Sequence, residues 1–411
     1  MPQSHAVHRL RPTFALVAAV SIAACSMSPD PTSSASSPGP TAGTTASPST
    51  VTPVPSTQAP TTAPLSLLGP LPSDALDAAT AARLQGEIDA IVEGGQPDVI
   101  AAVITSDGMW SGAAGVVGPD GRAASPDDVF ALASATKPVV AALMLRLEEL
   151  GKVDLDEALS TYIGDLEVDT NGATVREALA MRGGFGETDG AIVDEALADC
   201  ARAWTRDEVL AAFPATVGAA GERFSYSNPG YKLVGYVAEA VTGLSLAQAI
   251  NTYVVEPVGI DRLVLQGAEA VTPGPWALPL EANAGPIPIT EYGSGGTLPC
   301  LSDSTLSVAG TAMAGDALST ARWAWALFAG SIIDEASLAA MTDIDDDDYG
   351  LGIWQFTDFP PHRSFGHAGN KPGFAPLFAV LPDQQVVIVV CVNDQDADPY
   401  RPARRLLDVL E

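Results

Sequence analysis

The chain has 411 residues, enough for one large domain or two average ones, and 47% of them are hydrophobic. Its formal net charge is −30, from 50 acidic and 20 basic side chains. A polyanion of this kind repels nucleic acid and anionic lipid headgroups, so the charge argues against both as partners.

The first 24 residues have the features of an export signal. Arg9 and Arg11 precede an apolar run, residues 14–24, that is too short to span a bilayer. The run ends in Ile22-Ala23-Ala24-Cys25, which resembles the lipobox of bacterial lipoproteins and implies cleavage before Cys25 with lipid on its sulfur. An ordinary secretory peptide, cut at a small residue, is the alternative. We expect an exported protein, held at the bacterial cell membrane through Cys25 in the first case and secreted in the second.

The next segment has the composition of a stalk. Residues 26–64 are mostly Ser, Thr, Pro, Ala and Gly, with Asp30 as the single charge. Such a segment cannot bury enough apolar surface to fold. We therefore expect a disordered stalk over residues 25–74 and one folded domain over residues 75–411.

The domain begins with a helix pattern and a hairpin pattern. Apolar residues repeat at helical spacing within residues 75–92. Residues 99–106 and 109–117 then flank the turn pair Asp107-Gly108, which is typical of a β-hairpin. The sequence predicts two strands at this end of the domain.

Residues 134–340 read mostly as helices, and strand patterns return only near the end of the chain. They cover residues 351–356, 374–381 and 386–392, ahead of an apolar helix at 406–410. Strands at both ends with helices between them predict one sheet built from the two ends. The fold class is therefore α+β, with a helical insertion.

Ser134 and Lys137 stand three residues apart at the start of an apolar segment that ends at Gly151. Positions three apart share one face of a helix, so the hydroxyl and the amine can meet. Burial lowers the pKa of a lysine, and a neutral amine can then take the serine proton. The pair predicts a nucleophile with its own base. For the motif alone, a chance Ser-x-x-Lys with an exposed lysine is the alternative.

Two further segments carry candidate functional groups. Tyr226 and Asn228 lie two apart in a turn, where a phenol can relay a proton and an amide can hold a lysine and a substrate carbonyl. An ordinary Asn-Pro-Gly turn is the alternative. In a strongly acidic chain, Arg363, His367 and Lys371 fall within nine positions, which predicts a site for a carboxylate or other anion. A coincidental patch on a strand edge is the alternative.

The remaining polar residues give no pattern for a cofactor or a metal. Behind the signal the chain has two histidines, His362 and His367, and no Cys/His cluster. The acidic run 345–348 lacks the spacing of a calcium loop, so we expect a solvated surface loop. Cys391 lies in a predicted buried strand. Cys200 and Cys300 remain, and export permits either a disulfide between them or two free thiols.

In order, these segments resemble the penicillin-recognising serine hydrolases, in the β-lactamase-related group of class C β-lactamases, D-alanyl-D-alanine carboxypeptidases and esterases. The family order is Ser-x-x-Lys, Tyr-x-Asn, then Lys-Thr-Gly or His-x-Gly. This chain has Ser134-Ala-Thr-Lys137, Tyr226-Ser-Asn228 and His367-Ala-Gly369. Flanking segments agree, among them 129–133, 151–156, 221–224 and 372–374. The resemblance covers roughly residues 78–411 and implies the family's antiparallel sheet packed against a helical region.

The resemblance also implies roles by position. Ser134 would be the acylated nucleophile, with Lys137 and Tyr226 as the proton-transfer pair. Asn228, His367 and Gly369 would contact the substrate, and the backbone amides of Ser134 and Asn370 would form the oxyanion hole. Related sequences commonly read Leu-Leu-Ser-His-Thr-Ser-Gly where this chain has residues 178–184, Ala-Leu-Ala-Met-Arg-Gly-Gly, so that wall of the cleft is altered.

We expect a serine hydrolase that acts on a D-alanyl-D-alanine peptide of peptidoglycan, a β-lactam or a small ester. Its alternative is a non-catalytic wall-binding lipoprotein that keeps the fold, which the altered 178–184 segment and the stalk favour. A hydrolase with a histidine-based triad through His367 is a third hypothesis.

Overall fold

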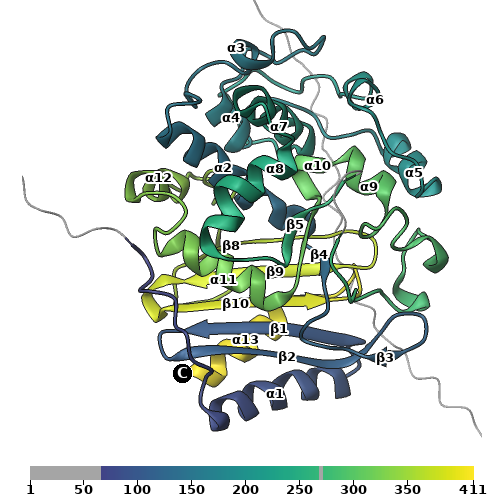
Figure 1. Ribbon diagram of the computed structural model, residues 1–411, viewed down its shortest axis with the longest axis vertical. Helices are drawn as coiled ribbons and strands as arrows, with labels where there is room; N and C mark the ends of the chain where they lie inside the picture. Colours follow the sequence, from purple (N-terminus) through teal and green to yellow (C-terminus); the bar gives the residue numbers. More distant parts are fainter. Residues whose placement is uncertain (1–65, 268–271) are drawn as a thin grey trace, which may run out of the picture. The chain divides into compact units, whose positions relative to one another are not determined.

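The computed structural model describes residues 66–267 and 272–411 (Figure 1). Its main feature is an antiparallel seven-stranded sheet in the order β3-β2-β1-β10-β9-β8-β7. The strands are β1 (Asp98–Thr105), β2 (Gly108–Val117), β3 (Arg122–Ala123), β7 (Trp354–Phe356), β8 (Ser364–Ala368), β9 (Ala375–Leu381) and β10 (Val386–Val392). The predicted α+β class and the sheet made from both ends of the domain are confirmed.

The centre of the sheet joins the two ends of the domain. β1 pairs with β10, with Ile100 opposite Cys391, and both strands are almost wholly buried. Alternate residues of β1 belong to two different apolar clusters, Ile100 to one and Val99 to the other, so both faces of the sheet are covered. Apart from Asp98 at the start of β1, β-branched and small side chains fill the buried positions of both strands, which favours extended backbone.

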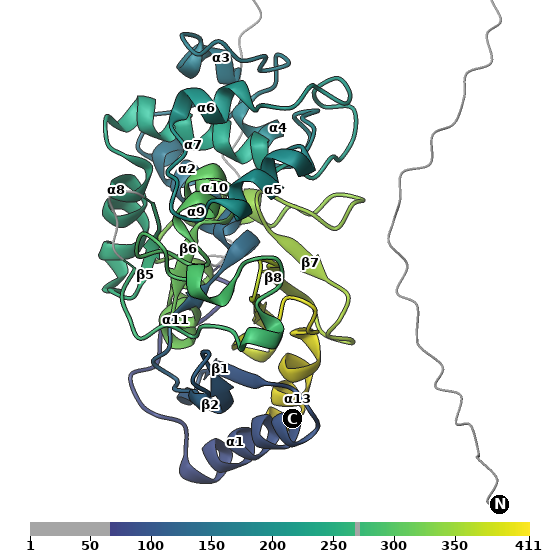
Figure 2. The same cartoon turned by 90° about the vertical axis from the view of Figure 1, so that its right-hand side faces the viewer.

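One face carries α1 (Ala78–Glu93) and α13 (Tyr400–Leu410), which lie side by side in both views (Figure 1, Figure 2). Leu84, Ile88 and Ile91 are the buried residues of α1, as the helical spacing predicts. The other face carries α11 (Ala317–Phe328), which contacts β1 and β10. The terminal helix begins earlier than its predicted range of 406–410. The prediction followed the apolar residues alone, whereas the first turns of the helix are amphipathic.

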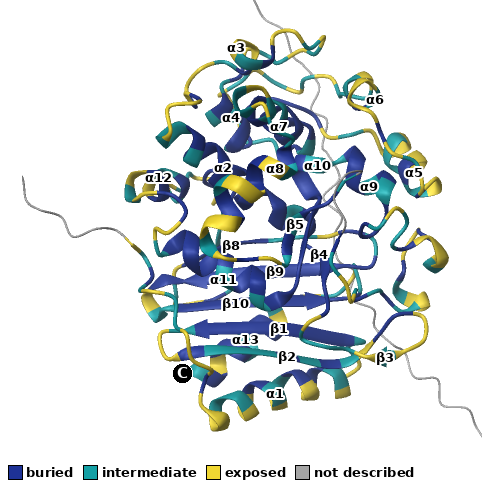
Figure 3. Ribbon diagram, viewed as in Figure 1, coloured by how far each residue is buried: buried dark blue, intermediate teal, exposed yellow. Residues whose placement is uncertain are grey.

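The helical region is centred on α2 (Thr136–Glu149), whose residues are buried on nearly every side (Figure 3). Around it lie α3 (Leu159–Ile163), α4 (Val175–Leu179), α5 (Gly190–Ala198), α6 (Arg206–Ala211), α7 (Asn228–Thr242), α8 (Leu246–Ile250), α9 (Leu301–Leu306), α10 (Val308–Thr311) and α12 (Glu335–Met341). Short 3₁₀ turns cover Ala133–Ala135, Glu256–Val258, Glu281–Asn283, Ile289–Glu291 and Pro382–Gln384, and Asn251–Val255 is a π-turn. A small second sheet has the order β4 (Phe130–Ala131), β6 (Met313–Gly315), β5 (Leu263–Leu265).

Within residues 66–267 and 272–411, no single helix is long and apolar enough to cross a membrane. The bent pair Asn228–Thr242 and Leu246–Val258 meets the length and composition criteria together. Nine of the fifteen residues of α7 are buried inside the fold, which accounts for its apolar composition.

The packed domain starts before residue 75. Leu68 is buried, and the backbone amides of Leu67 and Leu68 donate to the carbonyl of Phe328. Gly69 accepts a hydrogen bond from the indole of Trp325 and donates one to Gln385. Residues 67–69 therefore belong to the domain rather than to the stalk. Cys25, the signal and residues 26–65 lie outside the described residues.

Strand β8 was not predicted from the sequence, and neither were the two- and three-residue strands β3, β4, β5 and β6. The residues of β8, Ser-Phe-Gly-His-Ala, interrupt the apolar pattern with Gly366 and His367. The glycine is required there, because a Cβ would lie 2.0 Å from the carbonyl oxygen of Phe378 on β9. A close backbone approach of this kind leaves no periodic signal.

Cys200 and Cys300 form a disulfide with a Cα–Cα distance of 5.3 Å, and Cys391 is a free, buried thiol in β10. The bridge joins the segment after α5 to the residue that precedes α9. It links two parts of the helical region that are 100 positions apart in the chain.

Candidate active site

Ser134 lies in a tight turn between β4 and α2, and the backbone before it is strained. Ala133 has a φ of 47°, a conformation that costs a residue with a Cβ of order 1 kcal/mol or more. The buried hydroxyl of Thr136 holds the turn by donating to the Ala133 carbonyl (2.7 Å) and accepting from the Met313 amide (2.9 Å). The Leu132 amide donates to the Met313 carbonyl (2.8 Å), so strand β6 fixes the turn from both sides.

Lys137 is fully buried, and its ammonium nitrogen lies among three oxygen atoms. Nζ donates to Asn228 Oδ1 (2.7 Å) and to the Gly310 carbonyl (3.0 Å), and it lies 3.3 Å from Ser134 Oγ. Burial lowers the pKa of Lys137 to about 7, which Glu187 partly opposes by its negative charge and Lys371 reinforces. The amine is therefore neutral in a large share of molecules at neutral pH.

The three contacts of Lys137 differ in chemistry. The amide oxygen of Asn228 and the carbonyl of Gly310 can only accept hydrogen bonds, so they take the two N–H groups of a neutral amine. Its lone pair is then left for the remaining neighbour, the hydroxyl of Ser134. This geometry lets Ser134 donate its proton to Lys137, as a nucleophile does to its base.

Tyr226 completes the group around the lysine. Lys137 Nζ lies 4.7 Å from the centre of the Tyr226 ring. Burial raises the pKa of the Tyr226 phenol far above its usual value, although a hydrogen bond with Ser134 opposes this. The phenol is therefore protonated and lies beside the nucleophile, where it can give or relay a proton. Trp354 on β7 stacks parallel to its ring at a centroid distance of 6.5 Å.

Asn228 is the first residue of α7, and the turn before the helix is held by a cap. Ser227 Oγ accepts from the Gly230 amide (3.1 Å) and donates to the Gly186 carbonyl (2.8 Å). The exposed carboxylate of Glu187 accepts from both the backbone amide and the side-chain amide of Asn228, at 3.1 and 3.0 Å. The Asn228 side chain is thereby oriented with its oxygen toward Lys137.

His367 lies near the end of β8, against an aromatic cluster of Tyr226, Tyr349 and Trp354 with ring distances of 6.2–6.4 Å. It is buried, its Nδ1 pairs with the Ala368 carbonyl (2.6 Å), and its Nε2 has no partner among the described residues. Burial and the nearby Lys137 lower the pKa of His367 to about 3. The ring is therefore a neutral part of the wall, as the resemblance implies for its place in the cleft.

The anion site predicted from Arg363, His367 and Lys371 is wrong, because the three side chains do not converge. Arg363 stands before β8 and points to Asp383, 3.9 Å away, near the surface. His367 is neutral, and the ammonium of Lys371 is paired with Asp303 and buried. Arg363 and Lys371 lie at opposite ends of β8, a strand that the sequence pattern did not indicate, and each faces a different carboxylate.

Gly369 follows β8 and packs directly on the turn that carries Ser134. A Cβ on Gly369 would lie 2.7 Å from both the Cβ of Ala133 and the carbonyl oxygen of Leu132. Asn370 comes next, and its side chain is bound to the Gln395 carbonyl. Within the described chain, the backbone amides of Ser134 and Asn370 have no hydrogen-bond acceptor, so both remain available to an oxyanion.

The family model described as Beta-lactamase matches residues 77–411. The chain belongs to this family. The resemblance read from the three motifs is thereby confirmed.

Solved structures of the same architecture include amidases and a penicillin-binding protein homologue. D-amino acid amidase from Ochrobactrum anthropi, complexed with D-phenylalanine, is 21% identical with a TM-score of 0.67, over 81% of this chain and 99% of that one. A D-stereospecific amidohydrolase from Streptomyces is 22% identical with a TM-score of 0.65, over 80% of this chain and 97% of that one. The octameric homologue from Pyrococcus abyssi is 20% identical with a TM-score of 0.66, over 82% of this chain and 77% of that one. At these identities the likeness concerns the fold.

A curated relative, the flp protein of Staphylococcus aureus, is 28% identical over 144 residues. The similar stretch covers 33% of this chain and only 28% of that protein. The chain thus spans little more than a quarter of the length of the curated relatives it matches.

In this member of the Beta-lactamase family, ion pairs join the altered wall, residues 178–184, to the acidic run 345–348. Arg182 binds the carboxylates of Asp345 and Asp347, the latter at 2.7 Å. The acidic run is exposed at Asp346, Asp347 and Asp348, as expected of a surface loop, and Arg182 in addition fastens it to the domain. Tyr349 follows the run and enters the aromatic cluster beside Tyr226.

Sequence reasoning missed three groups of the site. Glu187 and the Gly310 carbonyl contact Asn228 and Lys137, and Tyr349 packs against Tyr226 and His367. A backbone carbonyl has no sequence signal, and Glu187 lies outside the three motifs, after a glycine-rich stretch. Acidic residues are frequent between the first and second motifs, so nothing in the sequence singles out Glu187 among them.

Proposed function

We propose that this protein is an exported serine hydrolase that forms an acyl-enzyme at Ser134 and cleaves an amide bond of a D-amino acid derivative. The observation that carries the proposal is the set of contacts at Lys137. Two carbonyl oxygens take the hydrogens of the neutral amine and leave its lone pair to Ser134.

In the acylation step, Ser134 Oγ attacks the substrate carbonyl carbon while its proton passes to Lys137 Nζ. The oxyanion that forms is bound by the amides of Ser134 and Asn370. Collapse breaks the bond to the leaving nitrogen, which receives the proton from Lys137 directly or through the Tyr226 phenol. Water then attacks the ester carbonyl and gives a proton to Lys137. The bond from the acyl carbon to Ser134 Oγ breaks to release the acid, and Lys137 returns the proton to Ser134 Oγ.

Two observations support the substrate class. Structures of the same fold include proteins described as D-amino acid amidase and D-stereospecific amidohydrolase. In this chain the exposed carboxylate of Glu187 lies beside Asn228, where it would attract the α-ammonium of an aminoacyl substrate. We therefore propose D-aminoacyl amides as the substrates. D-alanyl-D-alanine peptides, β-lactams and small esters are the other acyl donors with which they should be compared.

A panel of substrates tests this. It contains D- and L-phenylalanine amide, a D-alanyl-D-alanine peptide, nitrocefin and a short-chain nitrophenyl ester. We expect the D-amide to be cleaved at least tenfold faster than the L-amide. Labelling by a fluorophosphonate should disappear in Ser134→Ala but persist in Ser160→Ala, which changes an exposed serine of α3. A wild-type protein that neither turns over any substrate nor takes the label would instead favour a non-catalytic wall-binding protein.

Membrane anchoring is part of the same proposal and rests on the Ile22-Ala23-Ala24-Cys25 motif. Lipid on Cys25 would hold the hydrolase at the outer side of the cell membrane, with residues 26–65 as a tether. Cys25→Ser should move the protein from the membrane fraction to the medium. Cells that retain that variant in the membrane fraction would refute the anchor while leaving the hydrolase proposal intact.

A further inference from the structure

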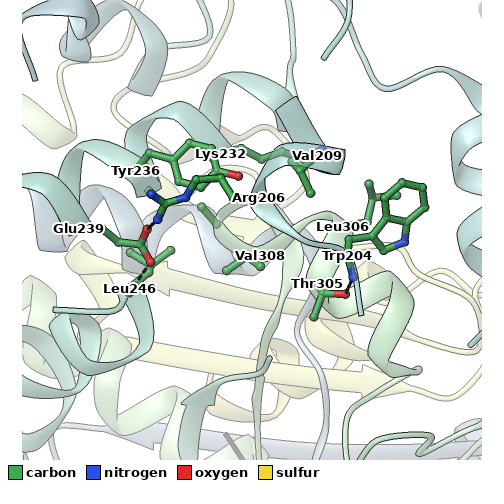
Figure 4. Close-up of a pocket in the computed structure, with 12 residues that line it drawn as sticks. Trp204, Arg206, Val209, Lys232, Tyr236, Glu239, Leu246, Thr305, Leu306 and Val308 are labelled. Atoms are coloured by element: carbon green, nitrogen blue, oxygen red, sulfur yellow. Dashed lines mark hydrogen bonds and ion pairs between the residues drawn. The ribbon is translucent and has the colours of Figure 1, made fainter. Parts of the chain in front are cut away.

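A cavity of about 190 Å³ lies in the helical region, apart from Ser134, and is partly open to solvent (Figure 4). Its walls are α6 with the segment before it, α7, the start of α8, the end of α9, and α10. Two of these walls adjoin the catalytic lysine. Asn228 stands one turn before Lys232 on α7, and Gly310 follows Ala309 on α10. The cavity is therefore next to the reaction site but is lined by different side chains.

Lys232 is the unusual residue of this cavity. Its side chain is only 6% exposed, and in the described part of the chain no carboxylate lies within ion-pair distance of it. Its single hydrogen bond is a long one, 3.4 Å from Nζ to Thr188 Oγ1. Glu187 acts on it only at a distance, and that carboxylate is already bound by Asn228. An ammonium has three hydrogens to donate, so a buried one with a single weak acceptor lacks partners.

The other charges of the cavity are already paired. Arg206 binds Glu239, and its guanidinium lies 4.8 Å from the centre of the Tyr236 ring. Figure 4 shows this ion pair on one side of the cavity, with Lys232 next to Tyr236 and reaching toward Val209. Among the described residues that line the cavity, Lys232 is thus the cation without an ion-pair partner, and it can bind an anionic ligand.

The rest of the lining is apolar and preformed. Trp204 forms one wall and is fixed twice to α9, by its amide to Thr305 Oγ1 (3.0 Å) and by its indole to Ser302 Oγ (2.9 Å). The Cys200–Cys300 disulfide ties the same two segments together. A rigid apolar wall opposite a buried cation favours a ligand with an apolar body and one negative charge.

We propose that this cavity binds a small monocarboxylate with an aromatic or branched aliphatic body, with its carboxylate on Lys232 and its body against Trp204. A cavity of about 150 Å³ holds a benzene ring, so this one has room for a ring and a carboxylate. Burial lowers the pKa of Lys232 to about 8, so the ammonium form still predominates at pH 7.

The test compares phenylacetate with phenylacetamide, which has nearly the same shape and no charge. Calorimetric titration of the full chain at pH 7 should show phenylacetate binding at least tenfold more tightly. In Lys232→Met the preference should fall to within twofold, whereas Lys152→Met, which changes an exposed lysine, should keep it. At pH 9 the acid should bind more weakly and the amide should not change.

A second variant separates this cavity from the catalytic cleft. Val308→Trp should fill the cavity from α10 while Lys232 itself stays unsubstituted, and it should abolish binding of both compounds. Circular dichroism checks whether each variant is folded. If Lys232→Met does not fold, the binding measurements on Val308→Trp decide the question. The proposal is overturned if neither compound binds, if acid and amide bind equally, if Lys232→Met keeps the preference, or if Val308→Trp still binds the acid.

Discussion

Lys137 Nζ is bound more closely by Asn228 Oδ1, at 2.7 Å, than by Ser134 Oγ, at 3.3 Å. The amide therefore positions the amine, and the nucleophile meets it as the weaker partner. Glu187 in turn orients Asn228 through the opposite end of the same amide. These contacts connect an exposed carboxylate to a buried base, so removal of the Glu187 charge should change the pKa of Lys137.

The first prediction concerns the pH dependence of acylation. Lys137 acts as a base only when neutral, so kcat/KM should rise with pH through about 7 and level off above it. The negative charge of Glu187 raises the pKa of Lys137, so Glu187→Gln should move this limb to lower pH. A neutral ester substrate keeps substrate charge out of the measurement. Glu222→Gln, at an exposed position, should leave the profile unchanged, and a shift to higher pH in Glu187→Gln would contradict the assignment.

The second prediction concerns the contact of Gly369 with the nucleophile turn. Gly369→Ala places a Cβ 2.7 Å from Ala133 and Leu132, so either β8 or the turn must move. We expect kcat/KM to fall by about 100-fold, since displacement of the nucleophile by an ångström has that cost, and stability to fall by about 1–3 kcal/mol. Gly86→Ala is the matched control, because a Cβ there meets no atom and the residue lies in an exposed part of α1. Full activity in Gly369→Ala would show that the turn tolerates the shift.

The third prediction concerns Arg182, which fastens the acidic run to the altered wall. In Arg182→Ala the segment 345–350 should exchange its amide hydrogens at least tenfold faster, because two ion pairs that hold it are lost. The free energy of unfolding should change by only about 1 kcal/mol, since these pairs are partly exposed. Arg176→Ala also loses two carboxylate partners, Asp156 and Glu148, but should not affect exchange in that segment. Equal exchange in both variants would mean that Tyr349 alone holds the loop.

A thiol count tests the disulfide. The oxidised domain without Cys25 should expose one reactive thiol, that of Cys391, and only after unfolding, since that residue is buried in β10. Reduction should lower the free energy of unfolding by about 2–4 kcal/mol, because the bridge closes a long loop in the unfolded chain. Three reactive thiols in the oxidised protein would disprove the bridge.

Local patterns were enough to predict the parts of the fold and the site that depend on spacing. Ser134 and Lys137 meet because residues three apart share a helical face, and β1 and β2 follow their turn pair. Tyr226, Asn228 and His367 were weak signals singly and became a site only through their order in the family.

The state of charge of the site could not be predicted in this way. His367 and Lys371 read as two cations, yet one is neutral through burial and the other is paired with Asp303, which lies 68 positions away. Whether a group is buried or paired is decided by tertiary contacts that no short segment encodes. Glu187 and the Gly310 carbonyl could not be predicted as parts of the site for the same reason, since each contacts a residue that is distant in the sequence.

The last prediction concerns Asp98, a wholly buried carboxyl at the start of β1. Its Oδ1 accepts from the Asn393 amide (3.0 Å), and its Oδ2 has no partner among the described residues. Burial raises the pKa of Asp98 to about 8, so between pH 4 and pH 8 the folded protein holds a proton that the unfolded chain releases. The contribution of this group to stability is therefore present at low pH and is lost as the pH rises toward 8, by at most about 1.4 kcal/mol per pH unit.

Asp98→Asn removes this titration and keeps the oxygen that Asn393 contacts. The free energy of unfolding of the variant, relative to the wild type, should therefore increase steadily from pH 4 to pH 8. Urea unfolding at several pH values measures the difference, and Asp107→Asn, in the exposed hairpin turn, serves as the control. A difference that stays constant over this range would show that Asp98 is ionised in the folded protein and that its charge is compensated by groups other than the Asn393 amide.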